Sequence, residues 1–88
     1  ALDMGLVNAV VESDRVLATA HELAARLATG PTAAYAAIKA SIAYAATTDL
    51  ESALAMEGQL QDAMGRTEDH LNATRAFIAK QPLVFEGR

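Results

Sequence analysis

Apolar residues recur every three to four positions along most of the chain, and short polar breaks that contain glycine or proline separate these stretches. Side chains at this spacing lie on one face of an α-helix. Only residues 6–11 depart from the pattern, as a short run rich in valine that predicts a β-strand. The pattern therefore predicts a mainly α chain, with one short strand followed by about four helices.

The predicted strand at residues 6–11 has no second strand in the chain to pair with. A strand leaves a row of backbone donors and acceptors that a neighbour must satisfy, and isolated strands are unstable in water. Residues 1–5 read as the last turn of a helix that a left-handed Gly5 closes. We therefore expect these 88 residues to be the C-terminal portion of a larger enzyme, whose N-terminal domain supplies the partner strands.

Capping and stop signals delimit the first two helices. Ser13 is expected to cap the first helix, and Gly30 to end it in a left-handed conformation. Pro31 follows directly and is tolerated in the first turn of the next helix, which runs to about residue 46. The expected buried pairs of the first three helices are Leu23 with Leu27, Ile38 with Ile42, and Leu50 with Leu54.

The last two helices carry their own start signals. Residues 48–51 match a capping box in which Thr48 is the N-cap, and this third helix is expected to end at Gly65. Thr67 begins a shorter fourth helix with two acidic residues in its first turn, where the helix dipole favours negative charge. This helix is expected to continue to the Gln81-Pro82 pair, and an extended tail follows it.

Composition limits the size of the core and the kind of partner. Hydrophobic residues make up 52% of the chain, but many are alanine, which buries little apolar surface per residue. We therefore expect other copies of the chain or another domain to complete the core. The net charge of −4 disfavours nucleic acid and anionic lipid as partners. The absence of cysteine and of a membrane-spanning run fits a cytoplasmic location.

Few residues suggest chemistry of their own. Glu57 falls on an otherwise apolar helix face, where a carboxylate needs a partner. It is either a general base or, as we favour, one member of an ion pair or hydrogen bond with an adjacent helix. His21 and His70 do not have the spacing of metal ligands, so we expect no metal site.

Several short motifs occur in order along the chain. They are GLVNAVV at residues 5–11, LAxxLAxGP at residues 23–31 with Lys39 after it, Glu57, and a C-terminal block made of Glu68-Asp69, AFxxKxP at residues 76–82 and FxGR at residues 85–88. Together these motifs resemble the C-terminal part of the crotonase superfamily, which contains the enoyl-CoA hydratases and isomerases. The resemblance spans the whole chain.

The resemblance implies a division of the chain and a role for each part. Residues 1–12 would end the spiral core domain, and residues 13–88 would form the C-terminal helical layer of the crotonase fold. That layer joins subunits into a trimer or a dimer of trimers and helps to cover the acyl-CoA substrate. The resemblance places the catalytic carboxylates and the oxyanion hole in the N-terminal part, and it implies no permanently bound cofactor.

Phe77 and Lys80 are the candidate coenzyme A contacts. The resemblance implies that they lie against the adenine and phosphate end of coenzyme A, which suits an aromatic wall and an ammonium group. Three positions apart, they would share one face of the fourth helix. The alternative is that Phe77 widens the apolar stripe and that Lys80 is a solvated charge near the helix end.

Two functions from different classes follow. The first is the oligomerisation and CoA-covering part of an enzyme that hydrates or isomerises enoyl-CoA thioesters through an enolate held in the oxyanion hole. The second is a helical oligomerisation or adaptor module without enzymatic activity.

Overall fold

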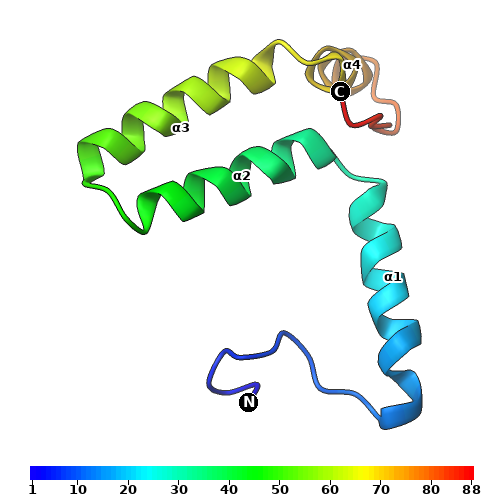
Figure 1. Ribbon diagram of the computed structural model, residues 1–88. Coiled ribbons are helices and arrows are strands. Elements are labelled where there is room, and N and C mark those ends of the chain that lie inside the picture. The colour runs from blue at the N-terminus through cyan, green and yellow to red at the C-terminus, as the bar shows by residue number, and fades with distance from the viewer.

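Four α-helices form the regular structure, and the computed structural model describes all 88 residues (Figure 1). A short 3-10 turn, η1 (Ser13–Arg15), comes first. The helices are α1 (Val16–Ala28), α2 (Thr32–Ala45), α3 (Leu50–Gly65) and α4 (Glu68–Ile78). The prediction of a mainly α chain with about four helices is confirmed.

The helices form an open arrangement. Figure 1 shows α2 and α3 side by side as an antiparallel hairpin. α1 leads away from the N-terminal end of α2, and α4 lies across the C-terminal end of α3. The radius of gyration is 16.8 Å, whereas a compact domain of this length has a radius of about 12 Å. None of the helices combines the length and the apolar content needed to cross a membrane.

The predicted strand at residues 6–11 is wrong, because these residues form no backbone ladder in the structure. No other segment of the chain offers them an open edge, and of their N–H groups only that of Leu6 has a backbone partner. The turn before them matches the expectation. Gly5 has a φ of +73°, its N–H donates to the carbonyl of Leu2, and the Leu6 N–H donates to the carbonyl of Ala1, both at 3.0 Å. This pair of bonds is the Schellman pattern of a helix end.

The expected burial of large apolar residues is also wrong within this chain. No hydrophobic residue is buried, and the members of the three predicted pairs are all exposed, up to 75% at Leu50. The accessible surface is 7230 Å², although a compact protein of this mass exposes about 4,900 Å². Two helices packed as a hairpin cover only one side of each other, so their outer apolar stripes have nothing to pack against.

The N-caps of α1 and α3 differ from those predicted. Ser13 begins the 3-10 turn, and α1 has no side-chain cap. At α3, Asp49 is the N-cap, and its Oδ1 accepts a hydrogen bond of 2.7 Å from the N–H of Ser52. The hydroxyl of Thr48 instead donates to the carbonyl of Tyr44 at 2.9 Å, so the N-cap lies one residue later than predicted and no capping box forms.

α1 ends at Ala28 with Thr29 as its C-cap, and Gly30 follows it in a role other than the one predicted. It does not adopt the left-handed conformation, which among the glycines occurs only at Gly5 and Gly87. A Cβ at Gly30 would instead lie 2.8 Å from Cζ and 2.9 Å from Cε2 of the Tyr35 ring. The glycine therefore makes room for this tyrosine, and Pro31 is the residue just before α2.

The cap of α3 gives a pH dependence. The hydrogen bond from the Ser52 N–H holds the pKa of Asp49 below its ordinary value of 3.8. A lowered pKa in the folded state means that the cap stabilises the helix above the unfolded value and is lost as the pH falls through the folded value. We expect the Ser52 amide resonance to shift upfield as the pH falls below the ordinary Asp49 pKa of 3.8. Asp49→Asn, which keeps the acceptor but does not titrate, should abolish this shift.

Candidate functional site

The candidate coenzyme A residues lie at the C-terminal end of α4. Phe77 is on the last turn and is 80% exposed, so its ring is free to contact a ligand. α4 ends at Ile78, earlier than predicted, and Lys80 lies beyond it with a φ of +54°. The Lys80 N–H donates to the carbonyl of Phe77 at 3.2 Å, and the Gln81 N–H donates to that of Ala76 at 2.8 Å.

These bonds correct the predicted relation between Phe77 and Lys80. The two residues do not share a helix face, because Lys80 occupies the left-handed position of a Schellman motif that usually holds glycine. Such a conformation costs a non-glycine residue about 1–2 kcal/mol. The exposed ring and the exposed ammonium nevertheless remain within the same turn of chain, at the tip of α4.

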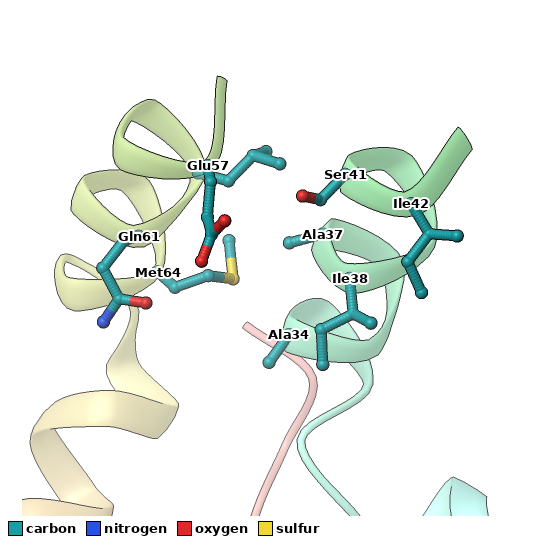
Figure 2. A pocket seen from close by; sticks show the side chains of 9 residues that line it. Ala34, Ala37, Ile38, Ser41, Ile42, Glu57, Gln61 and Met64 are labelled. Atoms are coloured by element: carbon teal, nitrogen blue, oxygen red, sulfur yellow. The ribbon is translucent and has the colours of Figure 1, made fainter. Parts of the chain in front are cut away.

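A groove runs between α2 and α3, with a cavity volume of about 450 Å³ (Figure 2). Both helices contribute mostly apolar side chains to it. Its lining consists of Ala34, Ala37, Ile38, Ser41, Ile42, Glu57, Leu60, Gln61 and Met64. The groove lies on the hairpin, and none of its lining residues belongs to α4.

Glu57 points into this groove from α3, as Figure 2 shows, and the Ser41 hydroxyl lies on the opposite wall. The expected ion pair or hydrogen bond of Glu57 is not formed. Its side chain is exposed in the groove. Water solvates the charge in this open groove, so the chain alone does not force the carboxylate to find a partner.

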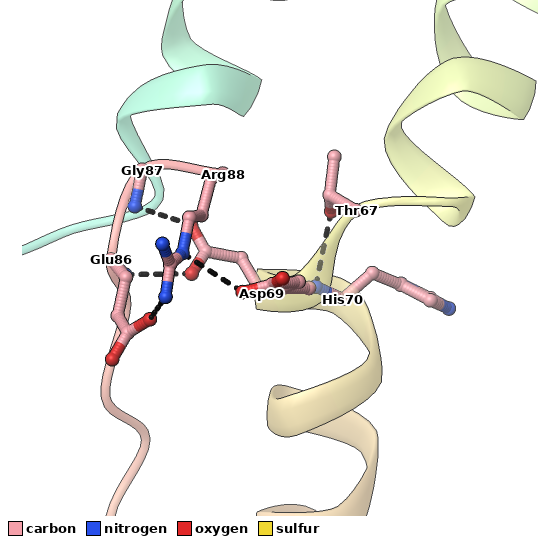
Figure 3. Close-up of polar contacts among 7 residues, drawn as sticks. Thr67, Asp69, His70, Glu86, Gly87 and Arg88 are labelled. Carbon is pink, nitrogen blue, oxygen red and sulfur yellow. Dashed lines mark hydrogen bonds and ion pairs between the residues drawn. The ribbon is translucent and has the colours of Figure 1, made fainter.

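Asp69, in the first turn of α4, is the one buried residue and is 4% exposed. Figure 3 shows the hydrogen bonds between its carboxylate and the C-terminal tail. Oδ1 accepts a hydrogen bond of 2.6 Å from the N–H of Glu86, and Oδ2 accepts one of 2.9 Å from the N–H of Gly87. The Asp69 N–H in turn donates to the carbonyl of Arg88 at 2.8 Å. Hydrogen bonds to a charged acceptor contribute about 1.5–3 kcal/mol each.

The side chain of Arg88 adds an exposed ion-pair cluster beside this contact. Its Nε lies 2.8 Å from Oε2 of Glu68, and its Nη2 lies 3.0 Å from Oε2 of Glu86. The carboxylate of Glu68, and then that of Glu86, raises the pKa of the Arg88 guanidinium further above its ordinary value. Because all three side chains are largely exposed, solvent screens their attraction and the buried Asp69 makes the stronger contact.

The tail also reaches the beginning of α2. Gly87 has a φ of +80°, and a Cβ there would lie 2.7 Å from Oγ1 of Thr32. Phe85 closes a smaller cavity of about 170 Å³ between α2 and α4, whose other walls include Ala34, Met64 and Ala73. The tail is extended, as predicted, and it ties the N-terminal ends of α2 and α4 together.

Sequence reasoning placed Asp69 in the first turn of α4 but missed its bonds to the tail. Two features of the sequence could have indicated this contact: the acidic first turn of α4 and the glycine-arginine pair at residues 87–88. The N-terminus of α4 and the tail both present backbone N–H groups, and such groups favour a carboxylate between them. The two histidines lie on different helices, and no group of three or more histidine, aspartate or glutamate residues is placed to hold a metal ion.

Comparison with known proteins identifies the family. The profile of the enoyl-CoA hydratase/isomerase family matches residues 1–88. The chain belongs to this family. It is 35% identical, over its full length, to the 1,2-epoxyphenylacetyl-CoA isomerase of Escherichia coli K12. It is also 35% identical over 83 residues, or 94% of the chain, to the short-chain-enoyl-CoA hydratase of Clostridium acetobutylicum.

Solved structures of the enoyl-CoA hydratase/isomerase family contain the same arrangement of helices. A Mycobacterium abscessus protein assigned to this family superposes on the whole chain with a TM-score of 0.95 and 39% identity. An enoyl-CoA hydratase from Geobacillus kaustophilus superposes with a TM-score of 0.93 and 33% identity. The chain covers 34% and 33% of these two structures and 34% and 32% of the two curated relatives, so it spans about a third of their length.

Proposed function

We propose that this chain is the subunit-joining and CoA-covering part of an enzyme that acts on enoyl-CoA thioesters. In this proposal, residues 1–12 end the core domain that carries the reaction centre, and residues 13–88 form a helical layer between subunits. The observation that carries it is the combination of family membership with an architecture that leaves its apolar residues uncovered. Such a layer acquires its core only by docking.

The uncovered surface supports the docking role. The chain exposes about 2,300 Å² more than a compact protein of its mass, which is in the range of an obligate interface. Exposed large apolar side chains lie on all four helices and on residues 2–11, and those on α2 and α3 are Ile38, Ile42, Tyr44, Leu50 and Leu54. The core domain of the same subunit and a second subunit would cover these side chains together.

Phe77 and Lys80 would contribute the coenzyme A contacts. Both are exposed at the tip of α4, where an aromatic ring can stack on adenine and an ammonium group can pair with a phosphate. Neither residue offers a proton transfer that a hydration or isomerisation needs, so they would bind the nucleotide and take no part in bond making. The catalytic acids and the oxyanion hole would belong to the core domain.

Calorimetric titration of the full-length protein with coenzyme A tests this proposal. An enzyme of this kind binds coenzyme A with a stoichiometry of one per subunit. A helical adaptor module without enzymatic activity, which is the competing function, binds none. Absence of binding together with absence of hydratase and isomerase activity on short-chain enoyl-CoA would refute the proposal.

Self-association should accompany folding of the full-length protein, because the helical layer leaves more apolar surface than one copy covers. We expect a trimer or a dimer of trimers with threefold symmetry. Sedimentation velocity at increasing protein concentration measures this state. A well-folded monomer at high concentration would contradict the expectation, and Leu54→Glu on the exposed face of α3 should weaken the association if that face is part of the interface.

A further inference from the structure

α4 and the C-terminal tail form a closed unit that is held at both ends. At one end, the Gln81 N–H bonds to the carbonyl of Ala76, and the chain reverses. At the other end, the carboxylate of Asp69 holds the N–H groups of Glu86 and Gly87, which are 17 and 18 residues away in sequence. When extended, residues 80–86 span about 20 Å, whereas the eleven residues of α4 span about 16 Å. The tail is therefore long enough to return along the whole helix.

Lys80 lies at the point where this unit reverses direction. It is the only residue other than glycine with a positive φ, at +54°, and nothing in its own side chain stabilises that conformation. The bonds on either side of it therefore hold it there. One set is the helix end, and the other is the attachment of the tail to Asp69.

We propose that Asp69 is a positioning residue for coenzyme A binding. It lies at the opposite end of α4 from Phe77 and Lys80, and it acts through the tail, whose attachment keeps the reversal at Lys80 in one conformation. Release of the tail lets Lys80 leave the left-handed region and sample many positions, so the ammonium is no longer held ready for a phosphate. This inference rests on the proposed role of Lys80 in binding the nucleotide end of coenzyme A.

The first test is Asp69→Asn in the full-length protein. An amide keeps the shape of the carboxylate, but it presents one acceptor oxygen and one donor NH₂ group to the N–H groups of Glu86 and Gly87. One of the two hydrogen bonds is therefore lost, and the NH₂ group lies against a backbone N–H. We expect hydrogen exchange at Glu86 and Gly87 to accelerate more than about tenfold. The KM for a short-chain enoyl-CoA should rise about tenfold with kcat within about twofold, the pattern of lost binding that is equal in ground and transition states.

The matched control is Asp62→Asn, which removes the same charge from an exposed acid that pairs only with Arg66. It should leave exchange in the tail and both kinetic parameters unchanged. The N-acetylcysteamine thioester of the same acyl group, which lacks the nucleotide, should react equally well with wild type and with Asp69→Asn. An equal loss on this truncated substrate would show a general structural defect and overturn the proposal.

Deletion of residues 86–88 provides a second route, because it removes the tail contact while Asp69 stays in place. It should reproduce the rise in KM, and combining it with Asp69→Asn should add nothing further, since both act on one contact. If Asp69→Asn does not fold, the deletion decides the outcome. Tail release without a change in KM overturns the positioning role, and if Lys80→Ala also leaves KM unchanged, the failure lies in the proposed function itself.

Discussion

Lys80→Ala in the full-length protein is expected, on the role proposed for Lys80, to raise the KM for an enoyl-CoA thioester while kcat stays nearly constant. Removing the ammonium group deletes one contact to a charged phosphate, which contributes about 1.5–3 kcal/mol. Since each 1.4 kcal/mol is a factor of ten, KM should rise between about tenfold and about 150-fold. Phe77→Ala, which removes an 80% exposed aromatic ring, should have an effect of similar size. Steady-state kinetics over a range of substrate concentrations measure both.

The left-handed conformation of Lys80 calls for a separate control. Lys80→Gly removes the ammonium but suits a φ of +54° better than lysine does, so it should stabilise the helix end and still raise KM. Lys39→Ala removes an exposed lysine from α2, a different helix from the one that carries Phe77, and should leave KM unchanged. If Lys80→Ala slowed the reaction of a thioester without the nucleotide as severely as that of the full substrate, Lys80 would not contact the nucleotide end of coenzyme A.

Local signals were sufficient to predict the helices. The four helices follow from apolar spacing, and the start of α4 at Thr67 and the end of α3 at Gly65 lie where the sequence predicts them. These features depend on residues within one or two turns of each other. The hydroxyl of Thr67, for example, accepts a hydrogen bond of 3.1 Å from the N–H of His70, only three residues away.

Burial and strand pairing were not predictable in the same way, because both depend on segments that the chain does not bring together. Leu50 has an apolar side chain at a helical core position, yet it is 75% exposed, since no third helix covers that side of the hairpin. Residues 6–11 have strand-forming composition but no neighbouring edge. Both patterns support the proposed docking role, in which partners outside this chain would supply the missing contacts.

The candidate site was predictable only in part. Phe77 and Lys80 were identified, but their relation was not, because a helix that stops at Ile78 turns Lys80 out of the helical register. The contact between Asp69 and the tail joins residues that are 17 and 18 positions apart. No local rule predicts such a pairing, even though each partner is recognisable by itself as a helix N-terminus or a glycine-containing tail.

Gly87→Ala is expected to destabilise the full-length protein by about 2–5 kcal/mol. Alanine at a φ of +80° costs about 1–2 kcal/mol. Its Cβ would also lie 2.7 Å from Oγ1 of Thr32, and forcing extra atoms into a packed contact costs typically about 1–3 kcal/mol. The free energy of unfolding from urea titration, together with hydrogen exchange in the tail, measures the effect.

Two further variants separate the strain in the backbone from the contact with Thr32. Gly5→Ala imposes a similar left-handed strain, at a φ of +73°, but its Cβ would meet nothing within 4 Å. It should therefore cost only the backbone term. Gly87→Ala combined with Thr32→Ala removes the hydroxyl that the new methyl group meets, so the double variant should recover most of the difference between the two glycine substitutions. Equal losses for Gly5→Ala and Gly87→Ala, with no recovery in the double variant, would show that the tail does not press against α2. The tail would then be held through α4 alone, by Asp69 and by the ion pair of Arg88 with Glu68.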